Sequence, residues 1–425
     1  MPPLRGAQRF MVPSPPPPAE LPRHLTLDAL RGIAVMGILA MNIIAFAMPE
    51  QAYLNPLAWG GSDPADLALW AVSMVMVDGK MRGLFSLLFG ASMLLVIERA
   101  EAKGESPARV HYRRMGWLML FGLAHYYLIW FGDILFLYAV VGMAAYPLRD
   151  RAPGALIRMG IACIAASFLI LALSAATFLF LEHAAGLPGA RPEIVASYRD
   201  TLNGIGAPGS ATIGQEVAVY RGDYAGILAL RFAAGPFTGL MFTGFETLGF
   251  MLIGMALLKN GFLTGGWAPA RYRRVAGIAY LWGLPPVIAL CAWCFASGFE
   301  PITTFNAVFA WALPFRLVLV IGHAALALWI VTTQRERAWV RRVAAAGRVA
   351  FTNYLGTSVV MTTLFYGYGL GLFGSLSRLE LIPFVLGGWA VILWWSKPWL
   401  ERFAYGPMEW LWRSLARRRI QPMRR

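Results

Sequence analysis

Apolar runs of about 20 residues recur along most of the chain, separated by short polar connections. A run of this length crosses a hydrocarbon layer about 30 Å thick as a helix. Backbone polar groups in lipid need partners within their own segment, so spans this apolar are helical. We predict ten spans, near 27–48, 79–97, 114–131, 133–149, 155–181, 238–258, 275–297, 305–332, 349–373 and 382–400. The pattern predicts an all-α, polytopic transmembrane helical bundle.

Two shorter apolar stretches, 64–77 and 224–236, are predicted to be re-entrant or interfacial helices. Composition agrees with a membrane protein, since 58% of the 425 residues are hydrophobic and only 14% are charged. A soluble protein carries about 25% charged residues. The short alternating segments of a lipid-facing barrel do not occur in this sequence.

Lysine and arginine fall mainly in alternate connections. With the N-terminus inside, the cytoplasmic segments hold 29 of the 37 basic residues, and the outer segments hold six. Basic residues accumulate in cytoplasmic loops, so this count predicts a multi-pass protein of the plasma (cytoplasmic) membrane with both termini in the cytoplasm. Because the basic residues lie in cytoplasmic loops, a membrane protein whose partners are lipids explains the net charge of +15. Nucleic acid is not expected as a partner.

The chain is predicted to have three parts. Residues 1–22 are Pro-rich and are expected to be a disordered cytoplasmic tail rather than a cleavable signal peptide. Residues 23–400 form the transmembrane domain, with one long outer loop at 182–223. Residues 401–425 read as a basic amphipathic tail in which Trp410 and Trp412 anchor the chain at the cytoplasmic leaflet.

The cysteines do not indicate a disulfide or metal site. The three cysteines lie in apolar segments, and the Cys291–Cys294 C-x-x-C pair has no second Cys or His cluster nearby. We therefore predict neither a disulfide framework nor a metal site.

Placing an ionisable or amide side chain at membrane depth costs free energy, so each such side chain is expected to have a structural or functional role. By helical rise, Asn42, Asp78, Arg82, His125 and Asp133 fall in the outer half of the bundle. One hypothesis is a polar cavity open to the outer side and centred on His125 as a general acid and base. Asp133 or Asp78 would orient the imidazole, and Arg82 or Asn42 would stabilise an oxyanion.

The alternative is that these groups are structural. His125 would then bond a neighbouring helix, Asp133 would cap the fourth span, and Arg82 would extend to the headgroups. At the inner end of the first span, Asp28 can cap the helix and Arg31 can bind a phosphate of a cofactor or a lipid. Extension of Arg31 to headgroups is the simpler interpretation there.

Several motifs occur in an order that resembles the YeiB-like family of integral membrane proteins, a group named as a domain of unknown function. The matching stretches run nearly the whole length of the chain, with the C-terminal half at about 238–400. They are 27–42, 81–92, 122–138, 245–263, 347–354 and 365–378.

A looser resemblance reaches transmembrane acyltransferases of the lysosomal heparan-sulfate N-acetyltransferase type. Their first span is similar to Asp28, Arg31, Gly32 and Asn42, and their second ends similarly to 89–92. The resemblance implies transfer of an acetyl group from cytoplasmic acetyl-CoA to a sugar across the membrane, with Asn42 helping to activate the acyl group or the acceptor. Those enzymes carry their catalytic histidine just before the second span, and 49–78 contains none.

Three functions follow as hypotheses. The first is an acyltransferase that uses acyl-CoA as donor and a glycan or small molecule at the outer face as acceptor, with His125 as the catalytic histidine. The second is a small-molecule transporter or exporter, in which the charges of Glu246, Arg316 and His323 would act. The third is a non-catalytic membrane scaffold or lipid-binding protein.

Overall fold

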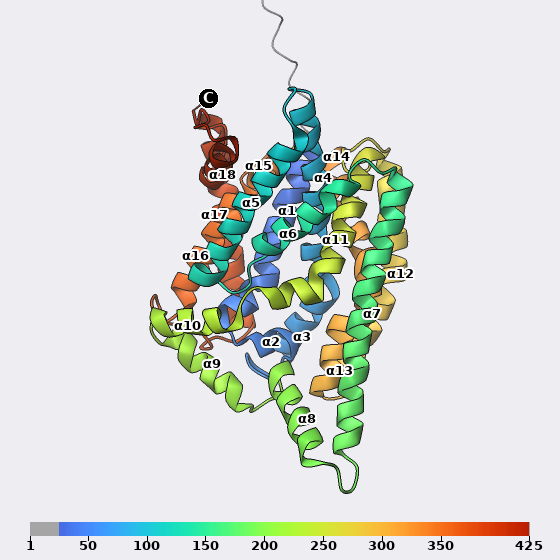
Figure 1. Ribbon diagram of the computed structural model, residues 1–425, viewed down its shortest axis with the longest axis vertical. Coiled ribbons are helices and arrows are strands. Elements are labelled where there is room, and N and C mark those ends of the chain that lie inside the picture. Colours follow the sequence, from blue (N-terminus) through green and yellow to red (C-terminus); the bar gives the residue numbers. More distant parts are fainter. Residues whose placement is uncertain (1–24, 425) are drawn as a thin grey trace, which may run out of the picture.

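A computed structural model describes residues 25–424, so the predicted tail at 1–22 lies outside the described residues. Within this range the chain forms helices and a single isolated β-bridge between Phe403 and Arg424, with no β-strand. The prediction of an all-α, polytopic bundle is confirmed (Figure 1).

Seven helical stretches of the described chain are long and apolar enough to cross a membrane. Their main helices are α1 (Leu25–Ala47), α4 (Lys80–Glu101), α7 (Pro153–Ala185), α11 (Phe237–Lys259), α12 (Pro269–Ala296), α14 (Leu313–Thr333) and α17 (Ile382–Arg402). The other three predicted spans correspond to shorter helices packed beside these. They are α5 (Pro107–Ala124) with the π-helical turn η2 (His125–Ile129), α6 (Leu135–Ala145) with the 3₁₀ turn η3 (Tyr146–Leu148), and α16 (Ala350–Phe365).

The two predicted re-entrant segments are short helices. One is α3 (Pro64–Val72) with the π-helical turn η1 (Ser73–Val77), which Asp78 and Gly79 separate from α4; the other is α10 (Tyr224–Ala234). Gly79 has a φ of 66°, a left-handed conformation that favours glycine and breaks the helix there. The predicted long loop carries α8 (Pro192–Ile205) and α9 (Ala211–Arg221).

The two ends of the bundle differ in charge. The C-terminus lies at one end in Figure 1, together with α15 (Ala338–Arg348), α18 (Pro407–Arg417) and the connections rich in Lys and Arg. We call this the basic end. The opposite end carries α8 and α9 with two short helices, α2 (Glu50–Leu54) and α13 (Pro301–Asn306), the latter continued by the π-helical turn η4 (Ala307–Trp311). A short 3₁₀ turn, η5 (Leu379–Leu381), precedes α17.

Helix α15 occupies a segment predicted as a connecting loop. Its apolar side chains recur at Val340, Val343 and Ala344 and are buried, as expected for an amphipathic helix against a core. The helix packs on α1 with almost no gap: a Cβ at Gly347 would lie 1.8 Å from the carbonyl oxygen of Asp28. Small residues allow this close approach and position the inner end of α1.

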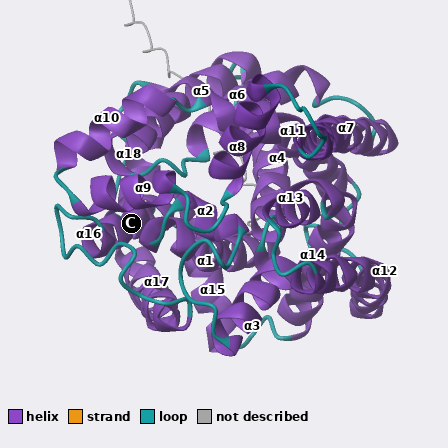
Figure 2. Ribbon diagram, turned by 90° about the horizontal axis from the view of Figure 1, so that it is seen from below, coloured by secondary structure: helices purple, strands orange, loops and turns teal. Residues whose placement is uncertain are grey.

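Close contacts also join the central helices α4 and α11. A Cβ at Gly90 would lie 2.1 Å from the carbonyl oxygen of Met251, and one at Gly254 would lie 1.9 Å from that of Leu87. Viewed from the opposite end, α1 and α4 lie inside the bundle, whereas α7 and α12 lie at its edge (Figure 2). The outer faces of α7 and α12 expose large apolar side chains, among them Leu173 and Trp282. Lipid-facing helices have this character.

Candidate functional site

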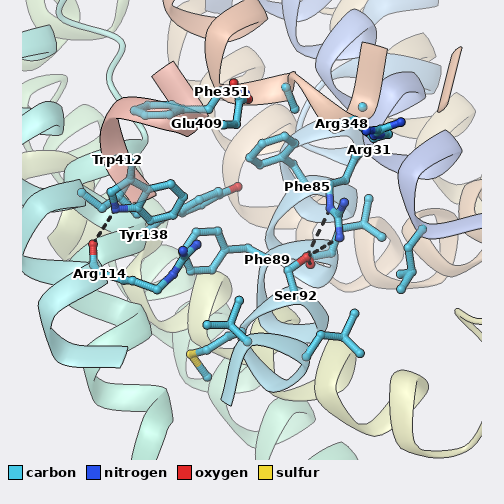
Figure 3. Close-up of a pocket in the computed structure, with 18 of the residues that line it drawn as sticks. Arg31, Phe85, Phe89, Ser92, Arg114, Tyr138, Arg348, Phe351, Glu409 and Trp412 are labelled. Atoms are coloured by element: carbon cyan, nitrogen blue, oxygen red, sulfur yellow. Dashed lines mark hydrogen bonds between the residues drawn. The ribbon is translucent and has the colours of Figure 1, made fainter. Parts of the chain in front are cut away.

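A cavity of about 250 Å³ lies near the basic end, between α1, α4, α5, α6, α15, α16 and α18. We call it the basic cavity, because five arginines line it against two carboxylates. Its polar and aromatic lining consists of Asp28, Arg31, Phe85, Phe89, Ser92, Arg99, His111, Arg114, Tyr138, Arg348, Phe351, Tyr354, Glu409, Trp412 and Arg413. Figure 3 shows most of these side chains around the space.

Arg31 is held at the wall of the basic cavity by two partners. Its Nη1 donates to Oδ1 of Asp28 at 2.6 Å, and its Nε and Nη2 donate to the Ser92 hydroxyl at 3.2 and 3.0 Å (Figure 3). The side chain remains 23% exposed. The two residues predicted to bind a cofactor, Asp28 and Arg31, therefore lie together at the basic cavity, with the guanidinium in a fixed orientation.

Helix α18 covers the basic cavity. Glu409 accepts from the backbone nitrogens of Phe351 and Thr352, at 2.7 and 3.2 Å, and from the Thr352 hydroxyl, so it caps α16. Burial raises the pKa of the Glu409 carboxyl. Trp412 donates to the carbonyl oxygen of Arg114 at 2.9 Å, and the Arg114 guanidinium lies 4.1 Å from the centre of its ring. The predicted amphipathic tail therefore packs the side that carries Trp412 against the bundle.

The lining combines positive charge with aromatic faces. Guanidinium groups match phosphate oxygens in paired hydrogen bonds and also stack on planar rings. Phe85, Phe89, Phe351 and Trp412 supply aromatic surface in the same cavity. The basic cavity therefore suits a ligand that carries several phosphates and a planar ring.

A buried histidine–carboxylate pair lies further from the basic end. Nδ1 of His125 lies 2.8 Å from Oδ1 of Asp133, and each side chain is 1% exposed. The other oxygen of Asp133 accepts from the backbone nitrogen of Phe136 at 2.7 Å and caps α6. Nε2 of His125 is buried and has no hydrogen-bond partner among residues 25–424. Asp133 favours the tautomer with hydrogen on Nδ1, which leaves Nε2 able to accept a proton.

Tyr354 connects this pair to the basic cavity. Its side chain lines the cavity, and its ring centre lies 5.1 Å from that of His125. Its hydroxyl accepts from the backbone nitrogen of Ile134 and donates to the carbonyl oxygen of Gly132, both at 3.3 Å. His125 is therefore one side chain away from the basic cavity.

Asn42 lies on the face of α1 that packs toward this region. It falls one turn from Ile38 and one turn from Phe46, and Phe46 stacks on Trp130 with ring centres 3.9 Å apart. The ring of Trp130 lies 6.2 Å from that of His125. Asn42 is buried, and its side chain makes no hydrogen bond among residues 25–424. Its amide is thus available on the side of α1 that faces the histidine.

A second group of buried charges lies between α4, α11 and α14. Glu246 accepts from Arg316 at 2.9 Å and from Arg82 at 2.8 Å. Asp78 accepts from the Tyr53 hydroxyl. With Lys80, these charged residues form what we call the charged layer: Asp78, Lys80, Arg82, Glu246 and Arg316.

Two π-helical turns supply carbonyl oxygens to this layer. Within η1, the carbonyl of Met74 accepts from Nζ of Lys80 at 2.5 Å, and that of Met76 lies 2.9 Å from Nε2 of His323. Within η4, the carbonyl of Val308 accepts from Arg316 at 3.3 Å. A π turn departs from the regular α-helical bond pattern and is frequent at functional sites. Here the departure provides acceptors for the buried cations of Lys80 and Arg316 and brings the carbonyl of Met76 to His323.

The five residues predicted as catalytic thus fall into two groups. His125 and Asp133 form one, with Asn42 on the facing side of α1, and Asp78 and Arg82 belong to the charged layer. No hydrogen bond or ion pair in the described chain joins the two groups.

The basic cavity also contains residues that the sequence did not single out as ligands: Arg99, Arg114, Arg348, Trp412 and Arg413. The four arginines were counted only as topology charges in basic connections, and Trp412 was expected to be an anchor at the cytoplasmic leaflet.

Comparison with known proteins finds relatives that match nearly the whole chain. A family described as a protein of unknown function (DUF418) matches residues 257–419. The chain is 32% identical to the uncharacterised protein YeiB of Escherichia coli (strain K12), over 94% of this chain and 98% of that protein. It is 29% identical to the uncharacterised protein YxaH of Bacillus subtilis (strain 168), over 93% and 95%. This chain, with its seven helical stretches long and apolar enough to cross a membrane in the described residues, therefore belongs to the YeiB-like family.

Proposed function

We propose that this protein is a membrane acyltransferase that binds an acyl-CoA donor in the basic cavity and uses His125 to transfer the acyl group. One observation carries the proposal: an arginine-rich cavity with aromatic walls ends at Tyr354, directly beside a buried histidine whose Nε2 has no hydrogen-bond partner in the described part of the chain. In this proposal the basic end faces the cytoplasm, as the distribution of Lys and Arg predicts.

The donor matches the lining group by group. Coenzyme A carries phosphate groups, an adenine ring and a narrow thioester arm. Arg31, Arg348 and Arg413 would bind the phosphates, and Trp412 or Phe351 would stack on the adenine. The thioester arm would extend along Phe89 toward the inner end of the cavity. Movement of the Tyr354 side chain would then bring the thioester carbon to His125.

The histidine would act as a general base. Nε2 removes the proton from an acceptor hydroxyl or amine, whose oxygen or nitrogen then attacks the thioester carbon. The carbon–sulfur bond breaks, and the proton passes from Nε2 to the leaving thiolate. Asp133 holds the Nδ1 hydrogen and stabilises the cation that forms, as a carboxylate does in a catalytic triad. The Asn42 amide would donate to the developing oxyanion.

A transporter is the second candidate, and the charged layer favours it. Charged groups buried within transmembrane helices commonly mark ion or substrate pathways. Arg82, Glu246 and Arg316 form such a group between α4, α11 and α14. This function would require flux of a small molecule in the absence of an acyl donor.

The first test is calorimetric binding of acetyl-CoA to the purified protein. We expect saturable binding that Arg31→Ala weakens about tenfold, the loss of roughly 1.4 kcal/mol of charge-assisted hydrogen bonding. Arg109→Ala is the matched control, because Arg109 is exposed at the same end and does not line the cavity. Absence of binding to folded protein at millimolar donor would reject the donor assignment and favour the transporter.

The second test separates binding from chemistry. His125→Gln should bind acetyl-CoA as the wild type does, because His125 lies outside the cavity lining, yet lose transfer of the acetyl group to water or an added acceptor. Loss of at least about a hundredfold is expected for a general base. Transfer at the wild-type rate would exclude His125 as the catalytic base.

A further inference from the structure

A second cavity, of about 300 Å³, lies on the other side of α1 and does not contact the basic cavity. We call it the lateral cavity. It is formed by α1 at 40–44, by α3 and η1 at 69–77 with the following Asp78, by α17 with η5 at 381–389, and by Tyr53 of α2. Asn42 and Phe46 face away from it, since its α1 lining includes Met41 and Ile44.

The lateral cavity borders the lipid-facing surface. Val72 and Leu386 line it, and both are exposed, at 57% and 54%. Apolar side chains this exposed on membrane helices face acyl chains. The remaining lining is largely apolar, and the indole nitrogen of Trp389 donates to the carbonyl oxygen of Met36 at 2.8 Å, so that side chain offers only its ring. An apolar chain can therefore enter from the bilayer.

Asp78 supplies the polar end of the lateral cavity. One of its carboxylate oxygens accepts from the Tyr53 hydroxyl, and the other has no hydrogen-bond partner in the described chain. A carboxylate in an apolar cavity recognises a hydrogen-bond donor. The ligand thus carries a donor group at the end of its apolar chain.

Neighbouring charges decide which donor fits. The charged layer behind Asp78 contains Lys80, Arg82 and Arg316 against Asp78 and Glu246, an excess of one positive charge. An additional ammonium group would increase that excess, so a neutral hydroxyl fits better than an amine.

The basic side chain at the other end of the lateral cavity does not provide a phosphate site. Arg378 donates to the carbonyl oxygens of Ala52, Pro56 and Trp59, at 2.6, 3.2 and 2.7 Å. Its hydrogen-bonding capacity is directed to the backbone around α2, where it is buried. A phospholipid headgroup therefore has no cationic partner in this cavity.

We propose that the lateral cavity binds a single-chain lipid from the surrounding bilayer, whose terminal hydroxyl donates to Asp78. This inference does not depend on the proposed acyl transfer. The test places the full chain in phosphatidylcholine nanodiscs with a photoactivatable long-chain alcohol, and maps the labelled peptides by mass spectrometry. Labelling should saturate and should concentrate on 69–78 and 381–389. Unlabelled hexadecanol should compete better than hexadecylamine or hexadecanoic acid.

Three variants test the position of the binding site and the role of Asp78. Val385→Trp fills the cavity and should abolish the saturable labelling, whereas Val391→Trp, on the same helix at a position that is 59% exposed, should retain it. Asp78→Asn should weaken hexadecanol competition about tenfold, because a charged acceptor is replaced by a neutral one. Labelling spread evenly over exposed helices such as α7 and α12 would overturn the site. Stronger competition by the amine would overturn the assignment of the hydroxyl.

Discussion

Replacing Glu246 with glutamine tests how the charged layer holds α4, α11 and α14 together. The Glu246 carboxylate receives one hydrogen bond from Arg316 at 2.9 Å and one from Arg82 at 2.8 Å. The Glu246 and Arg316 side chains are only 2% and 4% exposed, so water cannot replace the lost charge. Glu246→Gln would leave two guanidinium groups without their shared counter-ion.

Loss of one partner from a buried ion pair costs about 3–5 kcal/mol. One carboxylate serves two cations here, so we expect the free energy of unfolding to fall by an amount in the upper part of this range. That is a large share of a typical stability of about 5–15 kcal/mol. The double variant Glu246→Gln, Arg316→Met removes one of the two cations and fills its space with an apolar side chain. It should therefore be more stable than Glu246→Gln alone.

Reversible unfolding in mixed detergent micelles measures these differences. Glu401→Gln is the control, because Glu401 is exposed at the end of α17 and its one ion pair within the described residues is with Lys397. It should leave the unfolding midpoint unchanged. The reasoning fails if Glu246→Gln is as stable as Glu401→Gln, or if the double variant is no more stable than the single one.

Two further predictions concern α9 and α15. Glu216 of α9 accepts from the backbone nitrogen of Glu50 in α2 at 3.0 Å, and burial raises its pKa from the ordinary value of 4.5 to about 7. This contact of α9 with α2 should therefore weaken as pH rises between these values, and Glu216→Gln should remove the dependence. Hydrogen exchange of the α9 amides in the two proteins at each pH checks it, and equal pH dependence would contradict it. Gly347→Ala places a Cβ 1.8 Å from the carbonyl oxygen of Asp28 and should destabilise the fold by about 1–3 kcal/mol. Gly356→Ala on α16, where nothing lies within 4 Å of a new Cβ, should not destabilise it in the same unfolding assay.

Hydropathy was sufficient to predict the helical bundle, because the length of an apolar run and the cost of unpaired backbone in lipid are both local properties. Helix α15 was missed for a related reason. The connection that contains it holds five arginines, from 335 to 348, and these dominate the charge count, although Val340, Val343 and Ala344 recur at helical spacing. A test for amphipathic periodicity within basic connections would have found it.

The candidate site was harder to predict from the sequence than the helical bundle. His125 and Asp133 are eight residues apart across a tight connection, so their hydrogen bond could be anticipated from local geometry. The walls of the basic cavity depend instead on how α5, α16 and α18 are rotated about their axes. Arg114 and Arg413 carry the same charge as any headgroup-facing arginine, and only tertiary packing directs them into a cavity. The catalytic and binding roles proposed for these residues remain predictions.

The three π-helical turns have a consequence for how related chains can diverge. Each residue advances an α-helix by about 100°, so gain or loss of one residue at such a turn rotates every following side chain by that angle. Deleting one residue from η2 would thus rotate the segment before Asp133 about the helix axis and would leave the number of helices unchanged. Single-residue length changes at η1, η2 and η4 are therefore a route by which one scaffold can exchange the side chains presented to its interior.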